Sequence, residues 1–121
     1  MLTLELTQNE KTDLLDKKLN LRNSGTKIYL AENGEPIGVA ELLFEGEVEL
    51  LGFAIRPDCD SFYNRQFLFR GILFKLGQSG LSLKIKTDNK ELDKYGFATI
   101  GEYKKIECKQ AVYPSTCGKN C

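Results

Sequence analysis

The feature of the sequence that most constrains the fold is residues 27–44, KIYLAENGEPIGVAELLF. Two runs rich in strand-forming residues flank Asn33-Gly34, a dipeptide that supplies the positive φ angles a two-residue hairpin turn demands. A second tight connection follows at residues 45–47, and a third run, VELLGFAIR, stops at Pro57, which cannot donate a hydrogen bond to a sheet. The pattern predicts three consecutive antiparallel strands.

A long segment with helical periodicity follows these strands. In SFYNRQFLFRGILFKLG, residues 61–77, Ser61 is the expected N-cap of a helix and Gly77 its expected end. Residues 81–87 then alternate apolar and polar side chains, as a half-buried strand does. A strand, a helix and a strand in this order predict a right-handed crossover between parallel strands.

The flanking segments complete a mixed fold. Residues 2–6 predict a short strand, and Thr7 or Asn9 predicts the cap of a short helix that ends at residues 23–25. Residues 87–97 predict a short helix or a turn, and residues 98–113 predict one or two final strands. The prediction is an α+β (mixed α/β) fold with a mostly antiparallel sheet and one parallel pair around a central helix.

Length, composition and charge narrow the class of protein. A chain of 121 residues predicts a single domain, residues 1–121, with a cysteine-containing tail at about 107–121. We find neither a membrane-spanning run nor a signal peptide in the sequence, so we expect a cytoplasmic protein without a membrane partner. Residues 1–60 carry 6 basic and 12 acidic side chains and residues 61–121 carry 11 and 5, so the net charge is zero. This balance argues against a nucleic-acid partner, although the basic half favours a small polyanion.

The four cysteines are Cys59, Cys108, Cys117 and Cys121. Three of them crowd into the C-terminal tail, their spacing matches no common metal site, and the chain has no histidine to complete one. We therefore predict free thiols and no metal, with a soft-metal or redox tail as the alternative. Cys59 is interpreted as a small apolar filler, although a thiol beside a helix start can also be reactive.

Two segments resemble the GNAT superfamily of N-acetyltransferases. Residues 32–58, ENGEPIGVAELLFEGEVELLGFAIRPD, are similar to the hairpin and fourth strand of that family, and residues 87–103, TDNKELDKYGFATIGEY, are similar to its closing segment. The resemblance implies a V-shaped opening between the strands at residues 48–56 and 81–87, where acetyl-CoA binds. Its pantetheine arm would meet the backbone of Phe53, Ala54, Ile55 and Arg56.

The resemblance also implies where the diphosphate of acetyl-CoA binds. In the family it lies at the start of the following helix, where unpaired N–H groups and the helix dipole attract anions. The corresponding residues here are Ser61, Phe62, Tyr63, Asn64 and Arg65, and the closing segment adds Asn89.

The motif at this helix start departs from the family pattern. The family signature R/Q-x-x-G-x-G/A falls on residues 60–65, with Asp60 in the Arg/Gln position and with Tyr63 and Arg65 in the glycine positions. These side chains would crowd the diphosphate. Arg65 and Arg70 are candidates to bind it through their guanidinium groups instead.

Catalysis requires a base for the amine and an acid for the departing thiolate. The resemblance implies that the base is Glu49 on the fourth strand or Glu41 on the third. The alternative interpretation is that these are strand glutamates that face outward and have no catalytic role. A third interpretation is an acidic rim of Glu41, Glu45, Glu47 and Glu49 that attracts an amine. Tyr95 is the candidate acid, although the segment is shorter than in the family and Tyr95 can equally be a packing residue.

These observations predict an N-acetyltransferase that transfers an acetyl group from acetyl-CoA to a primary amine of a small molecule or protein. The alternative is a noncatalytic binding module of the same fold that has lost acetyl-CoA binding because Phe62 and Tyr63 fill the opening. A homodimer through the final strand is an additional hypothesis.

Overall fold

The computed structural model describes residues 1–6, 8–19 and 25–113. Within them, seven strands form one sheet in the order β1-β2-β3-β4-β5-β7-β6. Neighbouring strands are antiparallel except for β4 and β5, which are parallel. The strands are β1 (Leu2–Glu5), β2 (Thr26–Glu32), β3 (Glu35–Glu45), β4 (Glu47–Ile55), β5 (Ser82–Lys86), β6 (Ala98–Ile100) and β7 (Tyr103–Glu107).

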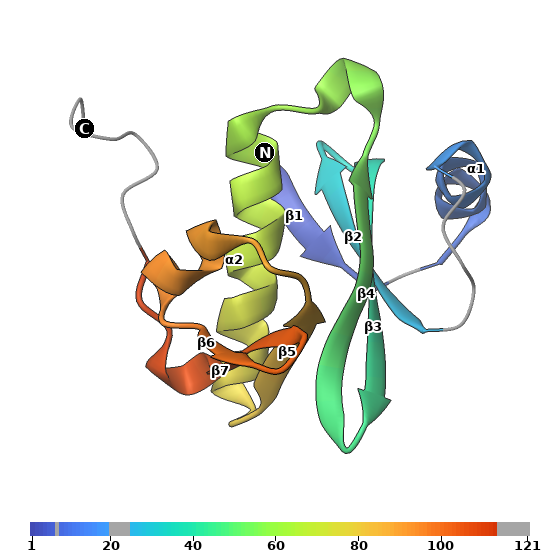
Figure 1. The fold of residues 1–121 in the computed structure, drawn as a ribbon. Coiled ribbons are helices and arrows are strands. Elements are labelled where there is room, and N and C mark those ends of the chain that lie inside the picture. The colour runs from blue at the N-terminus through green and yellow to red at the C-terminus, as the bar shows by residue number, and fades with distance from the viewer. Residues whose placement is uncertain (7, 20–24, 114–121) are drawn as a thin grey trace.

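Two helices cover opposite faces of this sheet (Figure 1). They are α1 (Glu10–Leu19) and α2 (Phe62–Gln78), and α2 is the crossover between the parallel strands β4 and β5. Three short 3-10 turns connect the other elements: η1 (Pro57–Cys59), η2 (Lys90–Tyr95) and η3 (Cys108–Gln110). The predicted mixed α+β fold with one parallel pair is confirmed. No helix of the described ranges is long and apolar enough to cross a bilayer.

The backbone conformations of the two hairpin turns are those that their residue types predict. Asn33 and Gly34 both have positive φ angles, 51° and 85°, as a type I′ hairpin turn demands. Gly46 joins β3 to β4 with a φ of 70°, a conformation in which a side chain would be strained. The prediction of three consecutive antiparallel strands is therefore confirmed.

Polar side chains mark the helix starts. The Ser61 hydroxyl accepts a hydrogen bond from the Asn64 amide at 3.1 Å, so Ser61 is the N-cap of α2 as predicted. The Asn9 side chain accepts from the amides of Lys11 and Thr12 at 2.9 and 3.1 Å, so Asn9 caps α1, and the other candidate, Thr7, lies outside the described residues. The predicted end of α1 at residues 23–25 lies largely outside the described residues.

The expected end of α2 at Gly77 is wrong. The helix continues to Gln78, and Gly80, with a φ of 68°, takes the left-handed conformation beyond its end. Gly77 has a different reason to be glycine. A Cβ at this position would lie 3.0 Å from the Cys108 carbonyl oxygen, so the missing side chain lets η3 approach the helix.

The main core lies between α2 and the sheet. Leu68, Ile72, Leu73 and Leu76 of α2 pack with side chains from the central strands, among them Leu42, Val48 and Leu83. A smaller cluster on the other face joins Leu15 of α1 to Tyr29 and Val39. The structure therefore depends on α2 far more than on α1.

This difference predicts unequal costs for the same substitution. Leu68 is 0% exposed and Leu14 is 68% exposed. Leu68→Ala should lower the free energy of unfolding by about 2–5 kcal/mol, because it leaves a cavity in the main core. Leu14→Ala should change it by less than about 0.5 kcal/mol. Urea unfolding of the two variants measures both, and equal costs would contradict this description of the core.

Candidate functional site

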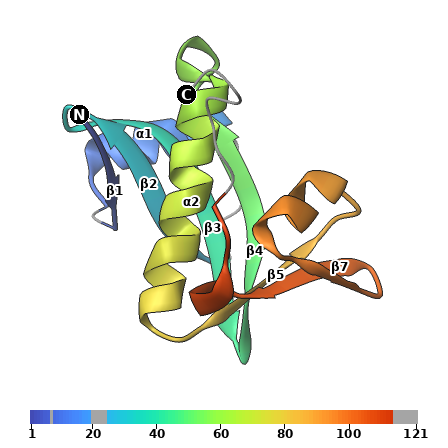
Figure 2. The ribbon, with the colours of Figure 1, turned by 90° about the vertical axis from the view of Figure 1, so that its left-hand side faces the viewer.

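The sheet opens between its two parallel strands. β4 and β5 are paired only over Val48–Leu83, Glu49–Lys84 and Leu50–Ile85. Directly after Leu50 the register between β3 and β4 shifts, so that Leu51 is an extra residue in β4. Such a bulge bends its strand and increases the local twist. β4 and β5 consequently diverge into a V, which Figure 2 shows opening away from their paired ends.

Among the described residues, no strand pairs with the side of β4 that faces away from β3 beyond the bulge. On the other side, the Arg56 amide donates to the Ile37 carbonyl of β3 at 2.7 Å. Because backbone groups alternate in direction along an antiparallel strand, those of Phe53 and Ile55 point away from β3 and into the V. These groups can accept or donate hydrogen bonds to an extended ligand.

A cavity of about 380 Å³ lies at the narrow end of this V. Leu50 and Phe53 also pack against the core beneath α2, so they form apolar walls. Leu51 and Gly52 contribute the bulge itself. The full lining is Glu49, Leu50, Leu51, Gly52, Phe53, Ile85 and Lys86.

The turn η1 leads from β4 into the start of α2, beside the V. The first four amides of a helix have no partner within it. Of these, the Asn64 amide donates to the Ser61 hydroxyl, whereas the Arg65 amide already makes the first helical hydrogen bond, to the Ser61 carbonyl at 3.0 Å. The amides of Phe62 and Tyr63 are the ones that a bound anion would meet.

The cationic side chains near this helix start are paired with carboxylates. Arg65 lies 3.0 Å from Asp60, and both side chains are about half exposed. Arg56 donates two hydrogen bonds to Asp58, at 2.9 and 2.6 Å. This contact lowers the pKa of Asp58 to about 2 and raises that of Arg56. An anion would have to compete with Asp60 for Arg65, but exposed ion pairs are weak.

Phe62 and Tyr63 do not fill the opening. Their side chains are 58% and 62% exposed, and Tyr63 packs beside Phe67, with ring centroids 6.4 Å apart, along α2. The form of the noncatalytic alternative in which these two rings close the site is therefore wrong. The reason is that both rings belong to the first turn of α2, whereas the buried side chains that face the sheet come from its later turns.

The two candidate bases have different surroundings. Glu49 is half-buried and lines the cavity at the V. Glu41 is 2% exposed and lies opposite Lys27 and Gly52 in the sheet, so it is not an outward-facing glutamate. Glu47 forms an ion pair with Lys105, which lowers the pKa of Glu47. The four glutamates therefore do not form one acidic rim.

Glu41 belongs to a polar cluster beneath α1. Lys27 Nζ lies 2.9 Å from Asp16, and the Tyr29 hydroxyl donates to the same carboxylate at 2.9 Å. Within the described part of the chain, Glu41 Oε2 has no hydrogen-bond partner. The contacts of Asp16 tie α1 to β2 on the face of the sheet opposite α2.

Tyr95 and Asn89 lie in and before η2. Tyr95 is buried, its hydroxyl donates to Gln66 of α2, and its ring contacts Phe69 edge-on at a centroid distance of 5.2 Å. It does not line the cavity at the V. The Asn89 side chain caps η2 by accepting from the Glu91 amide at 3.0 Å. Their predicted roles as acid and cofactor contact stay predictions.

The described cysteines are free thiols. Cys59 is half-buried, and Cys108 is buried, which raises the pKa of its thiol to about 11. Cys117 and Cys121 lie outside the described residues. Among the residues that the structure describes, no group of three or more histidine, cysteine or acidic side chains is placed to hold a metal ion.

No family model matches the sequence, and no curated protein matches it. Solved structures match its fold. A GNAT family acetyltransferase from Brucella melitensis in complex with acetyl-CoA has a TM-score of 0.63 and 12% identity, over 88% of each chain. The ribosomal-protein-S18-alanine N-acetyltransferase from Escherichia coli has a TM-score of 0.62 and 15% identity, over 88% of this chain and 90% of that chain.

A third solved structure, a GNAT family N-acetyltransferase from Escherichia coli in complex with CoA, has a TM-score of 0.64 and 13% identity. It is matched over 88% of this chain and 81% of that chain. This chain therefore has the fold of the GNAT superfamily, and the resemblance found in the sequence is confirmed for the fold.

Five cavity residues were not among the predicted site residues: Leu50, Leu51, Gly52, Ile85 and Lys86. Leu51 lies at the bulge, and the only sequence signal for a bulge was Gly52, since an isolated glycine in a strand often marks one. Ile85 and Lys86 end β5, and the predicted opening between the two strands was the signal that would have located them.

The polar cluster generates a prediction about stability at high pH. Burial, together with hydrogen bonding to Asp16, raises the pKa of Tyr29 from 10.0 to about 12. The buried Tyr29 hydroxyl therefore stabilises the folded protein fully below pH 10, where the folded and unfolded states both keep the phenolic proton. This contribution to the free energy of unfolding is lost between pH 10 and 12, because in that range only the unfolded state releases the proton.

Urea unfolding across this range should show the wild type losing stability more steeply than Tyr29→Phe, which has no proton to lose. Absorbance titration of the phenolate provides an independent measurement. Parallel slopes for the two proteins would contradict the assignment.

Proposed function

We propose that this protein is an N-acetyltransferase that binds acetyl-CoA in the V between β4 and β5 and transfers its acetyl group to a primary amine. The observation that carries the proposal is the bulge at Leu51, which separates the strands and leaves backbone groups of β4 without a strand partner. Two of the three solved structures described above contain acetyl-CoA or CoA.

The residues at the V fit a pantetheine arm. The backbone of Phe53 and Ile55 faces the opening, with Ala54 and Arg56 between and after them, and Leu50 and Phe53 supply apolar walls. Phe62 and Tyr63 leave the opening clear. A ligand bound here would complete the hydrogen bonding of β4 as an added strand does.

The start of α2 fits a diphosphate less closely. The amides of Phe62 and Tyr63 and the helix dipole favour an anion, and Arg65 is exposed enough to reach it. The Ser61 cap engages the Asn64 amide, and Asp60 engages Arg65. Binding therefore requires the exposed Asp60–Arg65 pair to separate.

The residues that line the cavity suggest how the transfer proceeds. When bound, acetyl-CoA supplies an activated acetyl thioester. Glu49 is the proposed base that removes a proton from the attacking amine, directly or through a water. Tyr95, predicted as the acid, donates to Gln66 outside this cavity. Lys86 is the proton donor that lines the cavity, and its charge favours a departing thiolate.

Calorimetric titration of the reduced protein with acetyl-CoA and CoA tests the binding step. We expect micromolar binding of both. Arg65→Glu should weaken it by about ten-fold or more, because the variant replaces a phosphate contact with a repulsive charge beside Asp60. Lys17→Glu is the matched control, because Lys17 is exposed on α1 and its replacement changes the net charge by the same amount.

The absence of heat at millimolar ligand would reject acetyl-CoA binding and favour a noncatalytic binding module. That second candidate is supported by one observation: Asp60 already engages the guanidinium of Arg65 that a diphosphate would use. Equal weakening by Arg65→Glu and Lys17→Glu would show only a general charge effect and would reject the proposed contact.

A second experiment tests the base. Once an acceptor is found by following thiol release with a panel of primary amines, Glu49→Gln should lower kcat by about 10²–10⁴-fold. Affinity for CoA should stay unchanged. Glu45→Gln, at the exposed end of β3, is the control. A full rate in Glu49→Gln would remove Glu49 from the mechanism.

A further inference from the structure

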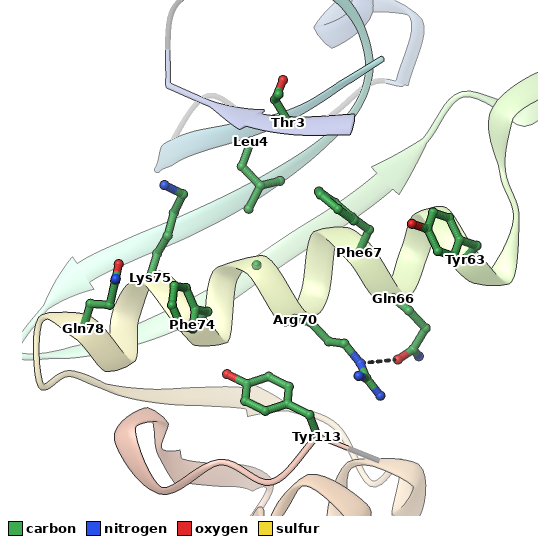
Figure 3. Close-up of a pocket in the computed structure, with 11 residues that line it drawn as sticks. Thr3, Leu4, Tyr63, Gln66, Phe67, Arg70, Phe74, Lys75, Gln78 and Tyr113 are labelled. Atoms are coloured by element: carbon green, nitrogen blue, oxygen red, sulfur yellow. Dashed lines mark hydrogen bonds between the residues drawn. The ribbon is translucent and has the colours of Figure 1, made fainter. Parts of the chain in front are cut away.

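A second hollow, of about 610 Å³, runs along α2 between β1 and Tyr113. Figure 3 shows Tyr63, Phe67 and Phe74 following one another along the helix, with Leu4 of β1 above it and Tyr113 below. We call this hollow the α2 groove. It shares no lining residue with the cavity at the V, so its occupant does not depend on the proposed acetyltransferase activity.

The α2 groove exists because α2 is apolar on two sides. Leu68, Ile72 and Leu76 face the sheet and are buried, whereas Tyr63, Phe67 and Phe74 lie along another face, spaced four and seven residues apart. Phe74 is 58% exposed. Exposed apolar side chains gathered along one face are typical of a binding surface.

β1 closes one wall of the groove through a close approach. A Cβ on Gly71 would lie 2.2 Å from Leu4 Cδ1, so the glycine lets the leucine side chain settle on the helix. Glycine inside a helix is less favourable than alanine. The close packing of Leu4 against Gly71 gives that glycine a structural role and produces an apolar floor.

The α2 groove also contains two cations, Arg70 and Lys75. The Arg70 guanidinium carbon lies 5.7 Å from the ring centroids of both Tyr95 and Tyr113, and its Nε donates to Gln66 at 3.3 Å. Within the described ranges, neither cation forms an ion pair with a carboxylate. Arg70 is thus held in place by two rings and an amide, while its charge lacks an acidic partner there.

We propose that the α2 groove binds a small amphiphilic carboxylate. Its hydrocarbon chain would cover Phe67, Phe74 and Leu4, and its carboxylate would pair with Arg70 in the bidentate geometry that a guanidinium favours. Lys75, farther along the helix, adds to the attraction.

The dimensions and charge of the groove distinguish this ligand from other occupants. Its volume lies within the roughly 300–1,000 Å³ of small-molecule sites, whereas a stable protein partner covers about 800 Å² on each side. Residues 114–121, which follow Tyr113 in the chain, contain Lys119 but neither an acidic nor a large apolar side chain. They complement neither the apolar lining nor the two cations.

Titration of the full chain with decanoate, followed by ¹H–¹⁵N spectra, tests the proposal. Decanoate should saturate and shift the amides of Leu4, Phe67 and Gly71, leaving Gly52 at the V unmoved. Decyltrimethylammonium, which has the same chain with a positive head, should bind about ten-fold more weakly or worse. Equal binding of the two amphiphiles, or shifts centred on Gly52, would overturn the proposal.

Variants separate the two halves of the site. Arg70→Gln should weaken decanoate binding about ten-fold, and Arg70→Lys should restore part of it, because charge without the planar fork is retained. Phe74→Asp places a repulsive carboxylate on an exposed position, so it should abolish binding while the protein stays folded. Lys17→Gln on α1 is the control for net charge. Unchanged affinity in both Arg70→Gln and Phe74→Asp would overturn the proposal.

Two further outcomes would assign the α2 groove to another occupant and also overturn the proposal. The first is a ligand-free dimer in sedimentation velocity that Phe74→Asp dissociates, which would make a second copy of the chain the occupant. The second is sedimentation with phosphatidylglycerol vesicles, lost in Arg70→Gln, without saturable binding of monomeric decanoate. That result would make the groove a membrane contact.

Discussion

The bulge at Leu51 is the constraint on which the rest of the site depends. Without the extra residue, β4 would keep its direction beside β5 and its pairing could continue past Leu50 and Ile85. With it, pairing stops after Leu50 and Ile85, and the strands separate over the cavity that Glu49 and Lys86 line. The opening costs hydrogen bonds within the sheet, so a ligand that restores them is favoured there.

The helix α2 connects the two halves of the sheet and contributes residues to three different parts of the structure. One face supplies the main core, the N-terminus lies beside the V, and another face lines the α2 groove. The buried face makes its position rigid, because Leu68, Ile72 and Leu73 are fully enclosed. Ligands at either of the other surfaces therefore meet a support that packing has already ordered, which reduces the entropy cost of binding.

The helix start shows how a glycine-free turn can keep its shape. Glycines in such a turn let backbone amides approach a diphosphate, and here Tyr63 and Arg65 occupy those positions. Both side chains extend into solvent, while Ser61 and the Asn64 side chain, which donates to the Cys59 carbonyl at 2.8 Å, hold the turn in place. The turn is thus well formed, and its affinity for anions depends on how readily Asp60 releases Arg65.

The sequence by itself determined the elements whose causes are local. Asn33-Gly34 sets a hairpin turn, Ser61 caps α2, and the alternation in β5 identifies its buried side; each depends on a few neighbouring residues, so reading them in order predicted the mixed fold. Only the tertiary structure decided the bulge at Leu51, the burial of Glu41 beneath α1 and the contact of Tyr95 with Gln66. These features arise from contacts between different strands and helices, where register and packing density, rather than local propensity, set the lowest free energy.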